Sequence, residues 1–264
     1  DEQNAIAAQA IKQSQAALVP CRSQRDSFPE PLRRKITVLP EGLPLEHYGS
    51  NPQARLQCGD LHLAAGEPLV TLVSRNLEPL RGLRQVLQAW PLVLEQRPDA
   101  QLLLVGDPSP NGYGIEAPVH ATHLDDAVAE LPAAIDRHSI HSLGVLDHIS
   151  LVTLLQCSAC HLALSYPYTL SWSNLEALAC GAPVITNLGS ALSHEVEDGV
   201  SGMLCSFADV RGLAELILEL LRSPDLRKRL GAEGETIVRQ RFSQQVALEE
   251  FNQLLQQLTS VSNG

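Results

Sequence analysis

The sequence HLALSYPYTLSWSNLEALACGAPVIT, residues 161–186, contains the pattern that decides the fold. It begins with an apolar run at His161–Ser165, continues through a polar stretch and a helix pattern, and ends with a second apolar run at Pro183–Thr186. Strand, helix and strand in this order are typical of a parallel sheet covered by helices. Gly181, just before the second run, is the residue type that most often ends a helix.

The same alternation continues on both sides of this stretch. Further strands are predicted, between helix patterns, at Ile36–Leu39, Leu69–Val73, Gln101–Val105, Ser139–Leu143 and, more weakly, Met203–Ser206. Nearly continuous apolar runs are expected for strands that are buried on both faces. The sequence therefore predicts an α/β fold, a Rossmann-like parallel sheet with helices on both faces, whose ligand binds beyond the carboxyl ends of the strands.

Three polar residues are placed to begin the C-terminal helices. Asp209, Ser223 and Ser243 each precede a helical repeat of apolar residues. Their side chains are of the kind that accept hydrogen bonds from the first amides of a helix. Pro224, which follows Ser223, suits the first helical position.

Composition and charge restrict the classes of function. The chain has 264 residues, of which 44% are hydrophobic, and a formal net charge of -11. This acidic balance disfavours nonspecific binding of nucleic acid, and no apolar stretch reaches the roughly 18 residues of a transmembrane segment. Six cysteines are too sparse for a disulfide framework in a chain of this length, so we expect a reduced, cytoplasmic setting.

Two arginines follow the strand predicted at Leu69–Val73. Arg75 lies at its carboxyl end, and Arg81 precedes Gly82 where the next helix pattern opens. Two guanidinium groups beside the free amides of a helix start form a suitable site for a pyrophosphate. From spacing alone, two solvated surface arginines are an equally good interpretation.

Glu176 is the candidate polar residue of the second segment. A polar stretch from Thr169 to Ser173 leads into its helix, so we expect Glu176 about two turns from the helix start, on the same rim as Arg75 and Arg81. Its carboxylate is able to accept hydrogen bonds from a ribose diol. The alternative is that Glu176 only complements the helix dipole.

Five segments, in their order and spacing, resemble the C-terminal domain of the group-one glycosyltransferases (glycosyltransferase family four). They are RNLEPLRG, LLLVGD, LGVL, SWSNLEALACGAPVI and EVEDGVSGMLCSFAD, and the resemblance covers roughly residues 36–242. It implies the C-terminal half of a GT-B fold that binds a UDP-, GDP- or ADP-sugar donor. It also implies a retaining transfer of a hexosyl group, to an unknown acceptor, without a metal ion or a cofactor.

The resemblance implies roles for individual residues. Arg75 and Arg81 match the basic pair that grips the donor diphosphate and stabilises the departing phosphate. Glu176 matches the second glutamate of the E-x7-E motif, which holds the donor ribose. The loop whose amides meet the distal phosphate and the sugar corresponds to Leu170, Ser171, Trp172 and Ser173. The position that usually lines the base pocket is occupied by Gly144, Val145 and Leu146.

One position departs from the pattern of the family. Eight residues before Glu176 the family normally has a glutamate that contacts the donor sugar, and this chain has Tyr168. A YP-aromatic-x-LSWS version of the loop is found in a subset of the family. We therefore expect the departure to affect recognition of the sugar rather than of the nucleotide. No residue is assigned as a general base or nucleophile.

The resemblance also divides the chain into three parts. Residues 1–35 correspond to a remnant of the N-terminal acceptor domain and the crossover, 36–242 to the nucleotide-sugar-binding domain, and 243–264 to a helix that packs back on the acceptor domain. The acceptor domain is then expected in cis or in trans. Two other functions stay open: a free-standing nucleotide-sugar or partner-binding module without turnover, and a sugar-nucleotide epimerase of the same architecture.

Three further patterns are interpreted as structural. The run from Cys157 to His161 spells C-x-x-C-H, the haem-attachment pattern, but buried structural cysteines are the better interpretation. The H-x-x-H pairs His120/His123 and His138/His141 have no cysteine partner, so no metal site is predicted. The glycines of LVGDPSPNGYG do not fit the dinucleotide fingerprint G-x-G-x-x-G.

Overall fold

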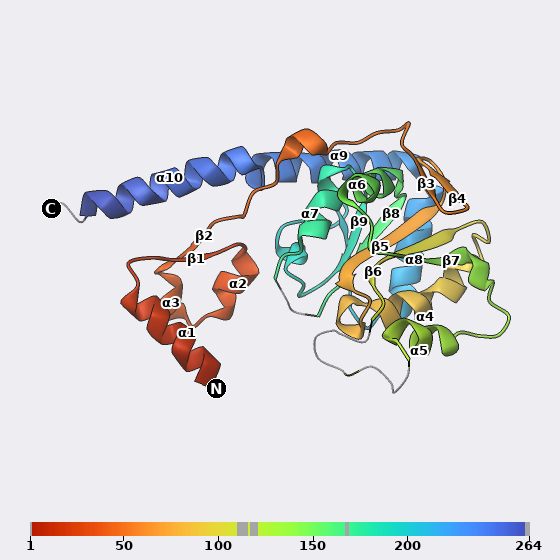
Figure 1. Ribbon diagram of the computed structural model, residues 1–264, viewed down its shortest axis with the longest axis horizontal. Coiled ribbons are helices and arrows are strands. Elements are labelled where there is room, and N and C mark those ends of the chain that lie inside the picture. The colour runs from red at the N-terminus through yellow and green to blue at the C-terminus, as the bar shows by residue number, and fades with distance from the viewer. Residues whose placement is uncertain (1, 110–115, 117–120, 167–168, 262–264) are drawn as a thin grey trace.

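A six-stranded parallel sheet forms the centre of the computed structural model, which describes residues 2–109, 116, 121–166 and 169–261. The strands lie in the order β10-β9-β8-β5-β6-β7 (Figure 1). Their bounds are β5 Leu69–Asn76, β6 Gln101–Asp107, β7 Ile140–Gly144, β8 Cys160–Ala163, β9 Val184–Asn187 and β10 Met203–Cys205. Along the chain, β5 comes first, β6 and β7 add to one side of it, and the other three add to the opposite side. This is the strand order of a Rossmann fold, and it confirms the predicted α/β class.

Helices cover both faces of the sheet. One face packs against α4 (Leu83–Leu94), α5 (His123–Ala129) and α8 (Val210–Arg222). The other packs against α6 (His148–Cys157), α7 (Trp172–Ala179) and a hairpin of β3 (Arg55–Cys58) and β4 (Leu61–Ala64), while α9 (Pro224–Arg241) packs on α7. Successive residues of a strand point to opposite faces. Accordingly, Leu102 and Leu104 of β6 pack in the core beneath α4, α5 and α8, whereas Leu103 and Val105 pack in the core on the opposite face.

Every strand predicted from the sequence is present, with its ends displaced by at most three residues. Three short strands were missed: β1 (Ala17–Val19) and the two strands of the β3–β4 hairpin. In β3, exposed residues alternate with half-buried ones, and in β4 the exposed His62 lies between the half-buried Leu61 and the buried Leu63. Because only one face of this hairpin is apolar, it lacks the continuous apolar run that marks the central strands.

The strand predicted at Ile36–Leu39 forms as β2 (Ile36–Val38), but it is not part of the central sheet. It pairs in parallel with β1, with Ala17 opposite Ile36. Together with α1 (Glu2–Gln13), α2 (Arg22–Ser27) and α3 (Glu30–Arg33), these strands form a small group at one end of the molecule (Figure 1). A separate core holds it together, formed by Ile11, Leu32 and Ile36. The first strand of the central sheet is therefore β5, and the division of the chain at residue 36 stays a prediction.

Two segments run side by side between the N-terminal group and the sheet. The amide of Leu43 donates to the carbonyl of Phe242 at 2.7 Å, and the amide of Gln244 donates to the carbonyl of Leu43 at 2.8 Å. Gly42 has φ 83°, and a Cβ atom there would lie 2.8 Å from the Cα atom of Gln244, so the close approach requires glycine. Beyond this crossing, α10 (Gln244–Val261) extends past the sheet over the N-terminal group (Figure 1).

An apolar cavity of about 370 Å³ lies between α10 and the N-terminal group. Leu18 and Leu39 line it from one side, and Leu248 and Phe251 line it from α10. Both Leu248 and Phe251 are exposed to solvent.

None of the helices in the described ranges combines the length and hydropathy that crossing a membrane requires.

The expected helix caps are present. The side chain of Asp209 accepts from the amide of Gly212 at 2.9 Å, and that of Ser223 accepts from the amide of Leu226 at 3.3 Å. Ser243 accepts from the amide of Val246 at 3.3 Å, so α10 begins as predicted. These side chains bond amides that have no partner within their own helices.

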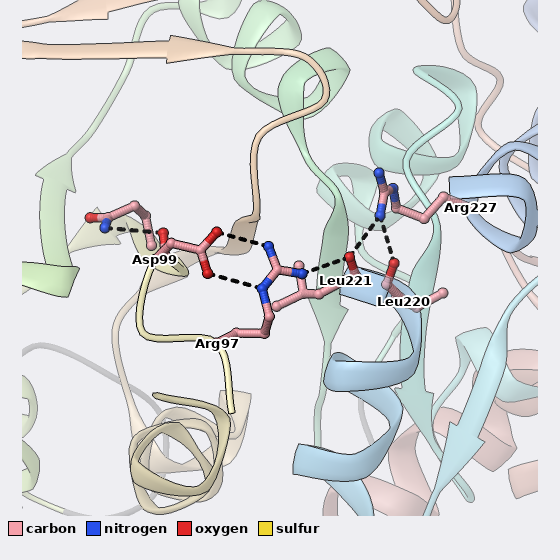
Figure 2. Close-up of polar contacts among 6 residues, drawn as sticks. Arg97, Asp99, Leu220, Leu221 and Arg227 are labelled. Carbon is pink, nitrogen blue, oxygen red and sulfur yellow. Dashed lines mark hydrogen bonds and ion pairs between the residues drawn. The ribbon is translucent and has the colours of Figure 1, made fainter. Parts of the chain in front are cut away.

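Two arginines close the C-terminal end of α8 (Figure 2). Arg227 of α9 donates from Nη1 to the carbonyls of Leu220 at 2.7 Å and Leu221 at 3.2 Å. Arg97, which follows α4, donates to the carbonyl of Leu221 at 2.9 Å and is itself held by the carboxylate of Asp99 through two bonds of 2.9 Å. The last carbonyls of α8, which have no partner within the helix, thus bind Arg97 after α4 and Arg227 of α9. These bonds lie at the end of the sheet opposite the expected ligand site.

Candidate functional site

A polar cavity lies where the chain leaves β5 and β8, at their carboxyl ends. It has a volume of about 80 Å³. Both predicted arginines line it, together with Ser165, Ser171 and Asn174. The strand order reverses between β5 and β8, which is the place where open parallel sheets bind their ligands. The structure therefore brings Arg75 and Arg81 together at the expected rim.

The guanidinium group of Arg81 forms an ion pair with a buried carboxylate. Its Nε atom lies 3.5 Å from Oε1 of Glu78, a residue that is 2% exposed. Both residues belong to the turn around η2 (Pro79–Arg81), a single 3₁₀ turn between β5 and α4. Sequence reasoning missed Glu78, although its position three residues before the arginine was a usable signal. The pair orients the guanidinium and balances its charge before any ligand arrives.

Arg75 is more open than Arg81. It is exposed near the end of β5, where the pairing with β6 is irregular between Val73 and Asn76. Among the residues that the structure describes, no hydrogen bond or ion pair engages its side chain. Gly106 of β6 permits the irregularity, because a Cβ atom there would lie 2.2 Å from the carbonyl oxygen of Ser74. Within the described part of the chain, nothing holds the side chain of Arg75 in place, as suits a residue that turns towards a ligand.

The start of α7 differs from the sequence prediction. The helix begins at Trp172, so Ser173 lies in its first turn and Glu176 is its fifth residue, little more than one turn from the start. Ser171 occupies the N-cap position, and its hydroxyl lies 2.8 Å from that of Ser173 instead of capping an amide. Among the described residues, no side chain caps the first amides of α7, and such amides are the groups that a helix start offers to an anion. Ser171 and Asn174, at this helix start, line the cavity.

Leu170 and Trp172 contribute to the loop in different ways. The side chain of Leu170 is buried in the core beneath α7, so only its backbone is available to a ligand. Trp172 is exposed, and its Nε1 atom donates to the carboxylate of Glu41 in the segment that follows β2. The position of Tyr168, where the family normally has a glutamate, lies outside the described residues.

Glu176 lies in a cluster with two residues that sequence reasoning missed. The side chain of Glu176 is 11% exposed, and its Oε1 atom accepts a hydrogen bond of 2.9 Å from the hydroxyl of Tyr48. His148, the first residue of α6, places its Nε2 atom 2.9 Å from the same hydroxyl and 3.7 Å from Glu176 Oε1. Tyr48 is 128 residues away in sequence and belongs to no motif, so no local pattern could have identified it.

The three residues of the expected base pocket lie at the end of β7, on the same edge of the sheet. Gly144 has φ 64° and allows the chain to turn there. Val145 is 77% exposed, whereas Leu146 packs against the core beneath α6. An exposed apolar side chain next to a turn offers a surface on which a planar base could lie.

The C-x-x-C-H run lies at the junction of α6 and β8, within the core. All six cysteines are free, and Cys157, Cys160 and His161 are buried. The described residues contain no group of three His, Cys, Asp or Glu side chains arranged to hold a metal ion. His120 lies outside the described residues.

The chain belongs to the group 1 glycosyltransferases. The model of the family described as "Glycosyl transferases group 1" matches residues 61–236, two thirds of the chain. The match includes both arginines, the whole of α7 and the turn at the end of β7. The resemblance inferred from the sequence motifs is thereby confirmed.

Two curated relatives show how much of such proteins the chain represents. N-acetyl-alpha-D-glucosaminyl L-malate synthase of Bacillus anthracis is 27% identical over 67% of this chain and 42% of its own length. A GDP-mannose-dependent monoacylated alpha-(1-6)-phosphatidylinositol monomannoside mannosyltransferase of Corynebacterium glutamicum is 30% identical over 72% of this chain and 47% of its own. The aligned part of this chain thus spans less than half the length of either relative.

Solved structures share the fold over nearly the whole chain. Sucrose-phosphate synthase from Thermosynechococcus elongatus superimposes with a TM-score of 0.80 at 24% identity, covering 99% of this chain and 63% of that one. The Anabaena protein HepE, in complex with UDP and glucose, gives a TM-score of 0.76 at 20% identity, with 97% and 67% covered. At these identities the likeness establishes the fold.

Proposed function

We propose that this chain is the donor-binding part of a retaining glycosyltransferase, which transfers a hexosyl group from a nucleoside diphosphate sugar without a metal ion. One observation carries the proposal: Arg75, Arg81 and the start of α7 surround a single cavity at the switch point of the sheet. Two guanidinium groups and free helix amides are complementary to a diphosphate. Retention and independence of metal follow from the resemblance to the family.

The diphosphate site serves transfer through the charge of the leaving group. When the bond between the anomeric carbon and the phosphate oxygen breaks, its electron pair stays with the nucleoside diphosphate. Arg75, Arg81 and the α7 amides lie where they stabilise this new charge. Such contacts accelerate the reaction because they are stronger in the transition state than with the bound donor.

The remaining donor contacts are assigned to two neighbouring groups of residues. Glu176 holds the ribose, and Gly144, Val145 and Leu146 line the pocket of the base. The amides of Leu170, Ser171, Trp172 and Ser173 meet the distal phosphate and the sugar. Residues 144–146 lie at the carboxyl end of β7, and residues 170–176 follow β8, whose carboxyl end lines the cavity together with that of β5.

An acceptor domain, in cis or in trans, completes this active site. In support, apolar residues stay exposed on α10 and β1, among them Leu18, Leu248 and Leu255. A further cleft of about 490 Å³ opens between α2 and the loop that follows β9. We place the protein in the cytoplasm, where nucleotide sugars are available and six free cysteines are stable.

Calorimetric titration with UDP, GDP and ADP tests the proposal. We expect one of the three to bind, because the diphosphate site is formed within this chain. Arg81→Ala is expected to weaken that binding by about ten- to a hundredfold, since a hydrogen-bonded ion pair to phosphate is lost.

Arg229→Ala is the matched control, because Arg229 is exposed on α9 and belongs to no part of the site. The nucleotide affinity of Arg229→Ala should equal that of the unchanged chain. If none of the three nucleotides bound at millimolar concentration, the proposal would be wrong. An equal loss in both variants would place the diphosphate elsewhere on the surface.

A further inference from the structure

Three side chains from distant segments meet at the carboxylate of Glu176. Tyr48 comes from the segment that connects β2 to the central domain, His148 begins α6, and Glu176 lies in α7. The hydroxyl of Tyr48 lies 2.9 Å from Glu176 Oε1 and 2.9 Å from His148 Nε2. The tyrosine and histidine rings pack edge to face, with their centroids 5.6 Å apart. The polar groups of both rings therefore approach the same oxygen of the carboxylate, Oε1.

The direction of the hydrogen bonds in this cluster follows from the single proton of the hydroxyl group. Tyr48 donates that proton to Glu176 Oε1, so Nε2 of His148 must carry a hydrogen and donate to the tyrosine oxygen. Burial, and then the charge of Glu176, raise the pKa of Tyr48 far above its usual value, so it remains a donor. A continuous chain of donors thus ends on one oxygen of the carboxylate, and each bond polarises the next.

Tyr48 cannot easily leave this position, because the residues after it are fixed to two helices. The carbonyl of Gly49 accepts from Gln156 Nε2 of α6 at 2.9 Å. The amide of Ser50 donates to Glu235 Oε1 of α9 at 2.9 Å. Gly181 makes room for this segment, since a Cβ atom there would lie 2.9 Å from the Cβ atom of Ser50. The contact to Glu176 is therefore built into the fold.

A nearly buried carboxylate needs partners for both of its oxygens. Among the described residues, Tyr48 and His148 approach Oε1 of Glu176, and no hydrogen bond is made to Oε2. This asymmetry leaves one oxygen of an oriented carboxylate for a ligand that carries hydroxyl groups. A carboxylate that served only the fold would gain more from a second internal donor.

We propose that Tyr48 is a positioning residue of the donor site, which fixes the rotamer of Glu176 so that its second oxygen receives a ribose hydroxyl. This inference rests on the proposed function, in which Glu176 holds the ribose. It adds a residue outside the family match, which begins at residue 61. It also makes the connecting segment a part of the donor site.

Pairs of nucleotides that differ only in the ribose diol isolate this effect. We would titrate the unchanged chain and Tyr48→Phe with UDP and with 2′,3′-dideoxy-UDP, and with the corresponding GDP and ADP pairs. Loss of one hydrogen bond to the carboxylate should weaken binding of the diol nucleotide by about three- to tenfold. Binding of the dideoxy nucleotide should change by less than twofold, because it makes no contact with Glu176.

Two further variants separate positioning from packing. Glu176→Gln should reduce the preference for the diol, and adding Tyr48→Phe to it should have no further effect. His148→Phe keeps an aromatic ring against Tyr48 but removes the donor to the tyrosine hydroxyl. We therefore expect it to weaken binding of the diol nucleotide too, but less than Tyr48→Phe does. Equal weakening of both nucleotides in Tyr48→Phe would mean that the tyrosine only packs, and the inference would be wrong.

The outcomes also distinguish this inference from the proposed function. If the unchanged chain bound none of UDP, GDP and ADP, the donor site itself would be refuted. If it bound the diol and dideoxy nucleotides equally well, nucleotide binding would stand and the positioning role would fall. If it preferred the diol and Tyr48→Phe kept the full preference, the role of Tyr48 alone would be refuted.

Discussion

Gly82 lies so close to Leu164 that a Cβ atom at residue 82 would be 2.5 Å from the Cβ atom of Leu164. Gly82 also has φ 75°, in the left-handed region that favours glycine. Next to this contact, the amide of Tyr166 donates to the carbonyl of Leu80 at 2.8 Å. The turn that carries Arg81 is thereby fixed to the segment that leaves β8, and the two halves of the diphosphate site are joined.

Gly82→Ala is therefore expected to lower the free energy of unfolding by about 3 kcal/mol, from overpacking and left-handed strain together. Urea denaturation measures the change. Gly59→Ala is the matched control, because Gly59 has φ 60° but no atom lies within 4 Å of the place that a Cβ atom would take there. In the control, the free energy of unfolding should fall only by the cost of left-handed strain, about 1 kcal/mol. Similar losses in both variants would show that the contact with Leu164 is unimportant.

The two arginines of the site should respond differently to removal. Arg75 is exposed and has no partner within the described ranges, whereas Arg81 is paired with the buried carboxylate of Glu78. Arg75→Ala should weaken binding of the preferred nucleoside diphosphate by about tenfold or more and leave the free energy of unfolding within about 0.5 kcal/mol. Arg81→Ala should reduce both quantities, because it leaves Glu78 without that counter-charge.

Calorimetry with the diphosphate and with the bare nucleoside separates these effects. Both variants should bind the nucleoside as the unchanged chain does, since the arginines contact only phosphate. A loss of stability in Arg75→Ala as large as that in Arg81→Ala would contradict the assignment of Arg75 as a residue kept free for the ligand.

The central sheet was predictable because its strands are buried on both faces. Runs such as Leu102–Val105 have no polar residue, and the pattern therefore signals a strand directly. The order of the strands could not be read from such runs, because it depends on contacts between helices and sheet. The distance of Glu176 from the start of α7 was overestimated for a local reason: several polar residues precede the helix, and only the fold decides that Ser171 is the N-cap.

The two arginines of the candidate site were predictable from their position next to a strand. Arg75 lies near the end of β5 and Arg81 follows it, so their position along the chain already placed them at the correct edge. Tyr48 and His148 reach Glu176 through tertiary contacts over 128 and 28 residues, and no periodicity encodes such distances. The pairing of Ile36–Val38 with β1 was missed for the same reason, because parallel partners are not adjacent in sequence.

Arg227 should contribute to stability rather than to the site. It closes α8 by donating to the carbonyls of Leu220 and Leu221 (Figure 2). Arg227→Met keeps most of the aliphatic chain but removes both bonds, and should cost about 1–3 kcal/mol in the free energy of unfolding. Lys228→Met, at the exposed neighbouring position, should cost less than about 0.5 kcal/mol. Nucleotide affinity should be the same in both variants, and a selective loss in Arg227→Met would contradict a structural role.

His161 should make the protein less stable in mild acid. Its imidazole is completely buried in β8, where Nδ1 lies 2.9 Å from the hydroxyl of Thr71 and Nε2 has no hydrogen-bond partner among the described residues. Burial lowers the pKa of His161 to about 4, against a smaller raising effect of Asn174. Above pH 6.5 the imidazole is neutral in the folded and unfolded chain alike, and it adds no dependence on pH.

Below pH 6.5 the unfolded chain binds a proton at His161 that the folded chain does not bind until about pH 4. The free energy of unfolding should therefore fall by about 1.4 kcal/mol per pH unit from this residue, or about 2 kcal/mol between pH 6.5 and 5. His161→Asn places an amide near the position of Nδ1 and does not titrate. Carboxylates contribute equally to both proteins, so urea denaturation from pH 7 to pH 5 should show the variant losing about 2 kcal/mol less than the unchanged chain. Parallel stability curves would mean that His161 is protonated in the folded protein, and that its burial is compensated by a partner for Nε2.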